Sequence, residues 1–571
     1  MARCVQRLIG SMIRSVIWFR RDLRLADHEP LLEGCRHGTV LPLFILDPAL
    51  LFHPETAVAR VAFLLESLRV LDQDLRRRGG RLLVRRGDPV TELVAVVKAA
   101  AADRVIAHTD SERLVGRWRD AAVNRRLAME AIPITWIEPA GASDALLGYP
   151  AWSRRWHRAM TEAPPAAPTR VAVPSPSECL PDLPIPTLQH LGLPPDRKPL
   201  PAAGTEAALL RLESFCTGPA SRRYYWELSY PSARVSTGLS PYLKFGVISP
   251  RLCLHRLASL AGQERTRQRS AVQLISRLRW GAGMHQRFRY LPQLEQSSLW
   301  TPFDVDAVPL AEGAPADGLE AELYAAWRQG RTGFPIVDAA ARCLAAEGGW
   351  LELNFRSRAI YASFLANLCG IDWRWGALHF MRHLIDGDCP IDHYQWAMQA
   401  GVTAAGSGSW TRIYHPGQVA VDRCDPQGLF IRRWLPELAG LTNDQLGSPP
   451  PMADYPRPIL DYDSARLRRL EILERRRLQI RDPSAAMARL PAAMPELFPA
   501  ALDLDQLDPA HWRALLSWFQ PGRRPVDAVP ADGSAAAAPP TRRRSARRAG
   551  APGQLSLDLA LDLEEGTAGS T

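Results

Sequence analysis

Residues 384–396 read LIDGDCPIDHYQW, in one of the most apolar parts of the chain. The acidic residues and the tryptophan in this stretch are Asp386, Asp388, Asp392 and Trp396. The preceding run, from Trp375 to Ile385, has a helical pattern that is expected to stop at Gly387. Carboxylates at a helix C-terminus face the negative end of the macrodipole, where Lys or Arg would be favoured. Three acidic residues there indicate a buried polar ligand with basic partners.

Around this stretch, strand signals are missing and helical periods dominate. We therefore predict a large all-α domain over residues 206–480. A Pro-rich segment, residues 141–205, has the composition of an extended connector. Residues 481–571 form a C-terminal extension, expected to be disordered after about 522, where its low-complexity sequence cannot bury enough apolar surface to fold.

Residues 15–140 alternate strand and helix signals. Helical patterns such as Val58 to Leu75 separate five apolar runs, SVIWF, VLPLFILDP, RLLVRRGD, RVIAHTD and PITWIEP. Short strands with crossover helices predict an α/β domain with a Rossmann-like parallel sheet. Neither G-x-G-x-x-G nor a Walker loop occurs in the chain, so the sequence gives no support for a dinucleotide or triphosphate site of those types.

Composition bounds the class of protein. At 571 residues, 46% hydrophobic and 23% charged, the chain can bury sizeable cores. Its nine cysteines show no C-x-x-C pair, so we expect no metal site, and a reducing cytoplasm fits. We expect no signal peptide, because the N-terminus lacks an uninterrupted apolar core and a small-residue cleavage site. We expect no transmembrane helix, because no run of 18 apolar residues occurs. A formal charge of +10 is compatible with nucleic-acid binding or with an Arg-rich solvated surface.

Several separated strings resemble the cryptochrome/DNA photolyase family over roughly residues 15–440. They are VIWFRRDLRLADHEPL (16–31), STGLSPYLKFGVISPRLCLHRL (236–257), GRTGFPIVDAA (330–340), SRAIYASFLANLCGIDWRWG (357–376) and the stretch at 384–396. The resemblance implies that the helical domain binds FAD in a folded, U-shaped conformation and works with blue light. Members of this family use either a folate or a deazaflavin as an antenna chromophore in the N-terminal domain; the sequence leaves antenna binding open here and assigns no residues to it.

The hydroxyl-rich turn before a predicted helix suits a diphosphate, although a simple N-cap is the alternative. The resemblance places the FAD phosphates against Tyr224, Ser236, Thr237, Gly238, Leu239 and Ser240. It pairs Arg358 with Asp386 beside the flavin, unless that pair is purely structural. It also sets Arg356 along the cofactor and Asp388 against the ribityl chain and ring edge.

Asp392 matches the position that faces flavin N5, which is Asn in most photolyases and Asp in plant cryptochromes. A carboxyl buried beside the ring should have a raised pKa and stay protonated, so it can donate a proton that Asn cannot. The alternative is an exposed loop aspartate. Trp396 and Trp373 match the inner and middle members of the family's electron-transfer chain. The outer position falls on Asp317, and the open substitutes are Trp375, Tyr361, Tyr394 and Trp300.

The lesion pocket of a repair enzyme is altered. Photolyases carry a motif like N-E-L-I-W-R-E-F, which is LISRLRWGAGMHQRF here and keeps Trp280. Arg277 stands at the Glu position, Gly281 at the following Arg, Met398 at a lesion-lining Trp and Ala359 at an active-site Met. Since these groups grip and protonate a pyrimidine dimer, their replacement weakens a repair assignment.

The C-terminal extension carries two features that point towards DNA. Gln554 to Leu559 (QLSLDL) resembles the peptide by which bacterial repair proteins dock on the replication sliding clamp, or is a random apolar patch. Arg542 to Arg548 would bind nucleic acid weakly and with strong salt dependence. The sequence leaves the oligomeric state open.

Three functions therefore remain. A photoreceptor is favoured by Asp392, Arg277, Met398 and Ala359. A divergent photolyase is favoured by the basic charge and the clamp-like peptide. A flavin-free helical protein that binds nucleic acid is the third.

Overall fold

The computed structural model describes residues 13–175, 180–181, 183–260, 262–304, 318–405 and 411–519. The predicted clamp peptide at 554–559, the basic run at 542–548, Asp317 and the segment after 522 lie outside these residues.

The N-terminal part is a five-stranded parallel sheet, and each of the five predicted apolar runs forms one strand. The strands are β1 (Ile13–Phe19), β2 (Gly38–Leu46), β3 (Leu83–Arg86), β4 (Arg104–His108) and β5 (Ile134–Ile137). Their order is β3-β2-β1-β4-β5, with Val16 opposite Leu41 and Val105. The predicted α/β class with a parallel sheet is confirmed.

Helices cover both faces of this sheet. They are α2 (Glu29–His37), α3 (Pro48–Leu51), α4 (Val58–Arg76), α5 (Pro89–Ala99) and α6 (Leu114–Met129). Successive β1 side chains point to opposite faces. Ile17 and Phe19 share a core with Leu68 of α4. Trp18 shares the other core with Leu93 of α5. Two covered faces explain why the strands read as continuous apolar runs rather than as alternating ones.

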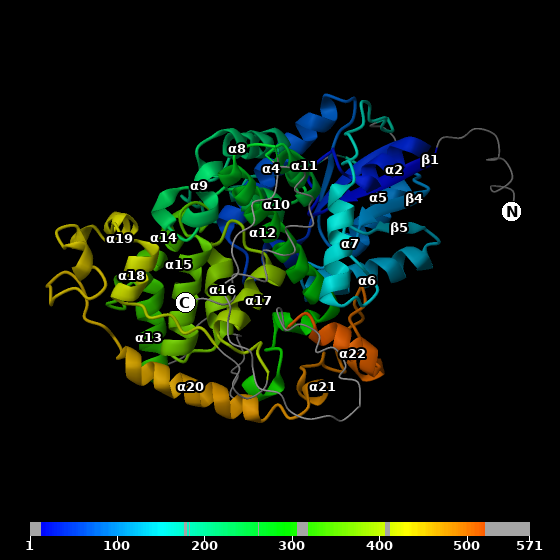
Figure 1. Ribbon diagram of the computed structural model, residues 1–571. Helices are drawn as coiled ribbons and strands as arrows, with labels where there is room; N and C mark the ends of the chain where they lie inside the picture. The colour runs from blue at the N-terminus through cyan, green and yellow to red at the C-terminus, as the bar shows by residue number, and fades with distance from the viewer. Residues whose placement is uncertain are drawn as a thin grey trace, which may run out of the picture.

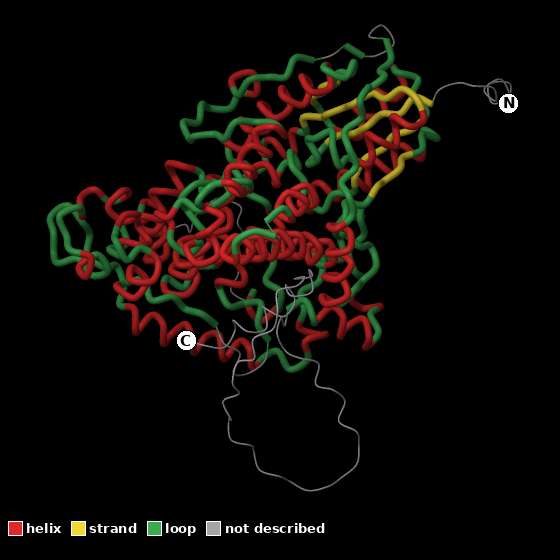
Figure 2. The backbone as a smooth tube through the Cα atoms, turned by 45° about the horizontal axis from the view of Figure 1, so that its top comes forward, coloured by secondary structure: helices red, strands yellow, loops and turns green. Residues whose placement is uncertain are grey.

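The rest of the described chain is helical, as predicted. Its helices are α7 (Tyr149–Thr161), α8 (Thr205–Thr217), α9 (Ala220–Glu227), α10 (Ser240–Lys244), α11 (Pro250–Ala258), α12 (Arg265–Tyr290), α13 (Gly318–Gln329), α14 (Pro335–Glu347), α15 (Phe355–Ser363), α16 (Trp373–His383), α17 (Cys389–Gln399), α18 (Gln418–Cys424) and α19 (Leu429–Trp434). Figure 2 shows the strands gathered at one end of the molecule and the helices filling the remainder.

A packed helix, α7, lies inside the segment predicted to be an extended connector. Trp152 and Trp156 of α7 are buried in the core that contains Met284 and Phe288 of α12. The Pro-rich composition reflects residues 163–201, which are without helix or strand in the described part apart from one short 3₁₀ turn. The overall composition of residues 141–205 therefore did not indicate the amphipathic helix α7.

The chain after the helical part returns to the N-terminal part. Helix α20 (Tyr462–Leu478) runs along the outer edge of the helical part (Figure 1), and α21 (Pro483–Ala486) and α22 (Pro509–Leu516) follow. The Phe498 ring lies 5.0 Å from the Trp136 ring of β5. Trp518 is fully buried, and its indole N–H donates to the Leu147 carbonyl. Among the described residues, no helix has both the length and the apolarity that a membrane crossing requires.

Candidate functional site

Asp388 and Asp392 lie at the start of a helix rather than at the end of one, and Asp386 lies in the loop before it. Helix α16 ends at His383, and α17 begins at Cys389 with Asp388 as its N-cap residue. Asp392 is in the first turn of α17, where the positive end of the macrodipole favours acidic side chains. The expected conflict with the helix dipole is therefore wrong. Pro390 is the local signal for this helix start, because proline is common in the first turn.

A cavity of about 560 Å³ lies between the two parts of the molecule, within the size range of ligand sites. It is bounded by the β1–α2 loop, α7, α10, α12, α15 and the α16–α17 segment; the predicted site residues on its wall are Ser240, Arg277, Trp280, Arg358, Asp386 and Asp388. A second cavity of about 60 Å³ shares Arg358, Asp386 and Asp388 with the first, and adds Ala359, Asp392 and Trp396. The two cavities therefore meet at the α16–α17 segment.

Arg358 and Asp386 form the predicted ion pair. Arg358 Nη2 lies 3.1 Å from Asp386 Oδ2 and also donates to the Gly349 carbonyl at 2.6 Å. Arg358 lies in the first turns of α15, whose N-cap residue Asn354 accepts the backbone N–H groups of Arg356 and Ser357. The cap fixes the start of α15, and the pair then joins α15 to the loop before α17.

Three basic side chains surround Asp388. Arg21 Nη1 lies 3.2 Å from its carboxylate, His285 Nε2 3.3 Å and Lys244 Nζ 3.6 Å. Burial alone would raise the pKa of Asp388, but Arg21, His285 and Lys244 lower it to about 2. Asp388 is therefore an anion at neutral pH. These basic partners come from the β1–α2 loop, α10 and α12. No local pattern in the sequence indicates that they meet at Asp388.

Asp392 has the opposite environment. Its side chain is 7% exposed, and Oδ2 has no hydrogen-bond partner among the described residues. Burial raises the pKa of Asp392 to about 8, although His393 lowers it in part. The carboxyl is therefore mostly protonated at neutral pH, and it lines the smaller cavity beside Trp396.

Trp396 lies flat against helix α16. A Cβ on Gly376 would come within 2.2 Å of the Trp396 ring, so only glycine allows this approach. The indole packs edge-on against Phe380 at 4.9 Å and Trp327 at 6.1 Å, and its N–H has no partner among the described residues. Trp373, the first residue of α16, donates its indole N–H to Ser298 Oγ at 3.0 Å.

The other predicted site residues do not line either cavity; they are Tyr224, Ser236, Thr237, Gly238, Leu239, Arg356, Trp373 and Met398. Ser236 and Thr237 hydroxyls accept the backbone N–H groups of Gly238 and Leu239, an ordinary turn arrangement. Arg356 Nη1 donates to the Tyr414 hydroxyl at 2.9 Å. These contacts give no direct indication of a ligand.

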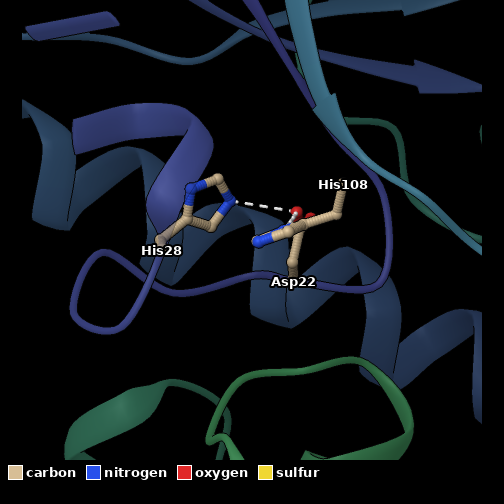
Figure 3. A group of neighbouring side chains, drawn as sticks. All are labelled: Asp22, His28 and His108. Carbon is tan, nitrogen blue, oxygen red and sulfur yellow. Dashed lines mark hydrogen bonds and ion pairs between the residues drawn. The ribbon is translucent and has the colours of Figure 1, made fainter. Parts of the chain in front are cut away.

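A buried histidine pair with an aspartate lies in the N-terminal part, next to the larger cavity (Figure 3). Asp22 Oδ2 lies 3.0 Å from His28 Nε2 and 2.7 Å from His108 Nδ1. His28 Nδ1 accepts the Leu31 N–H, so a neutral His28 carries its proton on Nε2 and donates it to Asp22. His108 Nε2 faces Glu29 at 3.3 Å. Asp22, His28, His108 and Glu29 therefore form one largely buried network of ion pairs.

The polar atoms on the cavity wall fit a flavin nucleotide. Asp392 Oδ2, Trp396 Nε1 and Asp388 Oδ1 are buried without a hydrogen-bond partner among the described residues. Arg358 and Lys244 supply positive charge on the same wall, which suits an anionic diphosphate. Apolar side chains such as Trp280 and Ile391 offer contact surface for aromatic rings.

Comparison with known proteins identifies the family of both parts of the chain. Residues 15–140 match the family model described as DNA photolyase, and residues 274–475 match the FAD binding domain of DNA photolyase. A deoxyribodipyrimidine photo-lyase of Synechococcus is 32% identical over 78% of this chain and 94% of its own length. A cryptochrome DASH of Natronomonas pharaonis is 31% identical over 79% of this chain and 99% of its own.

Solved structures show the same fold. A bacterial class III photolyase from Agrobacterium tumefaciens superimposes with a TM-score of 0.70 at 24% identity, over 83% of this chain and 100% of its own. With the two family models and relatives above 30% identity across most of its length, the chain belongs to the cryptochrome/DNA photolyase family, and its helical part contains that family's FAD-binding domain.

Proposed function

We propose that this protein is a photoreceptor-type flavoprotein, in which blue light drives an electron from Trp396 to FAD and Asp392 supplies the accompanying proton. Bound FAD supplies the light absorption and the one-electron chemistry. The observation that carries the proposal is Asp392, a carboxyl buried beside Trp396 with its pKa raised to about 8. An asparagine at this position would have no proton to give.

The tryptophans have a defined order in this proposal. Trp396 lines the smaller cavity and loses the first electron, and Trp373 refills it from the start of α16. The indole N–H of Trp373 donates to Ser298 Oγ, and this hydrogen bond fixes the orientation of the Trp373 ring.

In this proposal, the charged residues bind the cofactor and fix the protonation states of the carboxyl groups around it. Arg358 and Asp386 brace the cavity between α15 and α17 through their ion pair. Asp388 remains an anion between Arg21, His285 and Lys244, whereas Asp392 is a protonated carboxyl. Two carboxyl groups four residues apart thus have separate protonation states, which their surroundings set.

A divergent DNA photolyase is the second candidate. Trp280 and Arg277 both line the larger cavity, and a flipped lesion could stack on Trp280. The Arg277 guanidinium lies 5.7 Å from the Trp280 ring, and it could stabilise negative charge on a lesion electrostatically. Relatives named as photo-lyases favour this function, whereas the replaced lesion-pocket residues favour the first.

One experiment separates the two functions. The protein is purified in the dark and illuminated with blue light, with and without DNA that contains pyrimidine dimers, and dimers are counted afterwards. The proposal predicts light-driven flavin reduction and no loss of dimers beyond a protein-free light control. Dimer loss above that control would establish the photolyase and overturn the pure photoreceptor.

A further inference from the structure

His393, the residue after Asp392, joins the smaller cavity to the N-terminal part. Its ring is 3% exposed, and Nε2 lies 3.2 Å from Glu55 Oε1, in the loop before α4. Its other nitrogen, Nδ1, lies 3.7 Å from Asp392 Oδ2. Neither Nδ1 nor that oxygen has a hydrogen-bond partner among the described residues. The ring therefore stands between a buried anion and the carboxyl proposed to donate a proton.

Glu55 is held as a carboxylate. Arg113 Nη2 lies 2.5 Å from Glu55 Oε2, and Arg113 also faces Glu295 at 3.5 Å. Burial alone would raise the pKa of Glu55, but Arg113 and His393 bring it well below its usual value. Glu55 thus keeps its negative charge and accepts a hydrogen bond from the Nε2–H group of His393.

These surroundings make His393 a cation. Burial alone would lower the pKa of His393, but Cys389 and Glu55 raise it well above its usual value. Burial raises the pKa of the Cys389 thiol to about 12, so Cys389 is neutral at physiological pH and Glu55 is the anion that holds the charge. The other titratable and charged groups that influence Asp392, His393 or their partners are His53, Arg60, Arg113, Glu295 and Arg358.

We propose that His393 is an imidazolium held by Glu55, whose charge stabilises the Asp392 carboxylate that forms when Asp392 gives up its proton. This inference rests on the proposed function, because it takes Asp392 as the proton donor. Asp392 would release the proton of its carboxyl oxygen towards the bound cofactor, and Trp396 would supply the accompanying electron. His393 keeps both ring protons throughout, so no proton crosses its contact with Asp392.

His393 acts here as a positioning residue, and it resolves a difficulty with a buried acid. A carboxyl in an apolar pocket holds its proton, but it releases that proton poorly because the carboxylate left behind has no counter-ion. An imidazolium at 3.7 Å provides the counter-ion without ionising Asp392 beforehand. His393 and Glu55 together therefore leave Asp392 protonated in the dark and still able to donate its proton after illumination.

Two variants test the charge of His393 in the FAD-loaded protein. His393→Gln removes the cation, and Glu55→Gln keeps the ring but removes the anion that charges it. His393→Gln should raise the pKa of Asp392, read from its carboxyl infrared band in the dark, by about one unit or more. Glu55→Gln should raise it by less, because it also removes a negative charge that itself raises this pKa. His393→Gln should slow the proton transfer after a light flash by about tenfold, since one pKa unit corresponds to a tenfold change, and Glu55→Gln should slow it by a smaller factor. His511→Gln, an exposed histidine on α22, is the control and should change neither quantity.

The wild-type protein gives a readout that needs neither flavin nor a foldable variant. Nitrogen NMR of ¹⁵N-histidine-labelled protein should show both ring nitrogens of His393 protonated at pH 8. A neutral His393 at that pH would overturn the inference, as would His393→Gln and Glu55→Gln variants with wild-type Asp392 pKa and rate. Asp392→Asn in the same flash experiment separates the two claims. If Asp392→Asn transfers protons at the wild-type rate, the proposed function is wrong; if only the His393 and Glu55 variants behave as wild type, the inference alone fails.

Discussion

The raised pKa of the Asp392 carboxyl serves the proposed proton transfer and also affects the stability of the fold. The pKa of Asp392 is raised to about 8 because burial outweighs the attraction of His393. In an unfolded chain an aspartate titrates near about 4. Between these values the folded state holds one more proton than the unfolded state, so this residue lowers the free energy of unfolding as the pH rises.

Asp392→Asn should remove this dependence. Between pH 5 and pH 8 the variant should gain stability over the wild type by up to about 1.4 kcal/mol per pH unit. Urea unfolding without FAD at several pH values measures the difference, since cofactor binding then contributes nothing. A difference that stays constant from pH 5 to pH 8 would mean that Asp392 is ionised in the folded state.

Trp396→Phe tests the first electron donor. Phenylalanine fills most of the indole volume but is far harder to oxidise, so the rate of flavin photoreduction should fall by at least about tenfold, equivalent to 1.4 kcal/mol of barrier. Time-resolved visible absorption after a blue flash measures this rate. Trp226→Phe, at a tryptophan that is 44% exposed, is the control. An unchanged rate in Trp396→Phe would show that another residue donates first.

At the scale of elements, the strands and many helices could be predicted, because each has a local cause. The β1 run SVIWF is buried on both faces, and the apolar face of α4 packs on that sheet. The start of α17 was missed, because the aspartates were assigned to the preceding helix although Pro390 marks a new one. Helix α7 was missed because it is short and lies inside a Pro-rich segment.

The contact between α16 and α17 depends on one glycine. Gly376→Ala would place a Cβ 2.2 Å from the Trp396 ring, so we expect a loss of about 1–3 kcal/mol from overpacking together with slower photoreduction. Thermal unfolding and flash absorption measure the two effects. Gly116→Ala in α6 is the matched control, since its Cβ meets only Arg119 Nη2 at 3.7 Å. A Gly376→Ala protein as stable as that control would show that α16 can move away from Trp396.

At the scale of the molecule, the site is assembled from parts that are far apart in the sequence. The Arg358–Asp386 pair could be predicted from a family resemblance, and it forms. Glu55, Arg21 and Arg113 could not, because their partners lie in distant parts of the sequence, 338 residues away for Glu55 and His393, and no periodicity or motif records such contacts. Arg60 of α4 shows the same pattern, since it donates to the Leu384 carbonyl at 3.0 Å.

The chain after α20 belongs to the folded structure. Trp518 is fully buried and packs against Trp152 at 5.0 Å and Tyr290 at 5.8 Å. Trp518→Ala should therefore cost about 3–5 kcal/mol, as for other buried aromatic truncations. Trp226→Ala at an exposed position should change stability by less than about 0.5 kcal/mol. Equal thermal midpoints for the two variants would show that residues 480–519 add nothing to stability.

The most direct test of the whole account is a comparison of wild type and Asp392→Asn, both purified in the dark and then illuminated with blue light under a thiol reductant. Wild type and Asp392→Asn should both show flavin absorption, and light should reduce the flavin in both. Only the wild type should develop the long-wavelength absorption that a proton at N5 gives a one-electron-reduced flavin. Absence of flavin, absence of any light response, or the same long-wavelength absorption in Asp392→Asn at the wild-type rate would contradict the account.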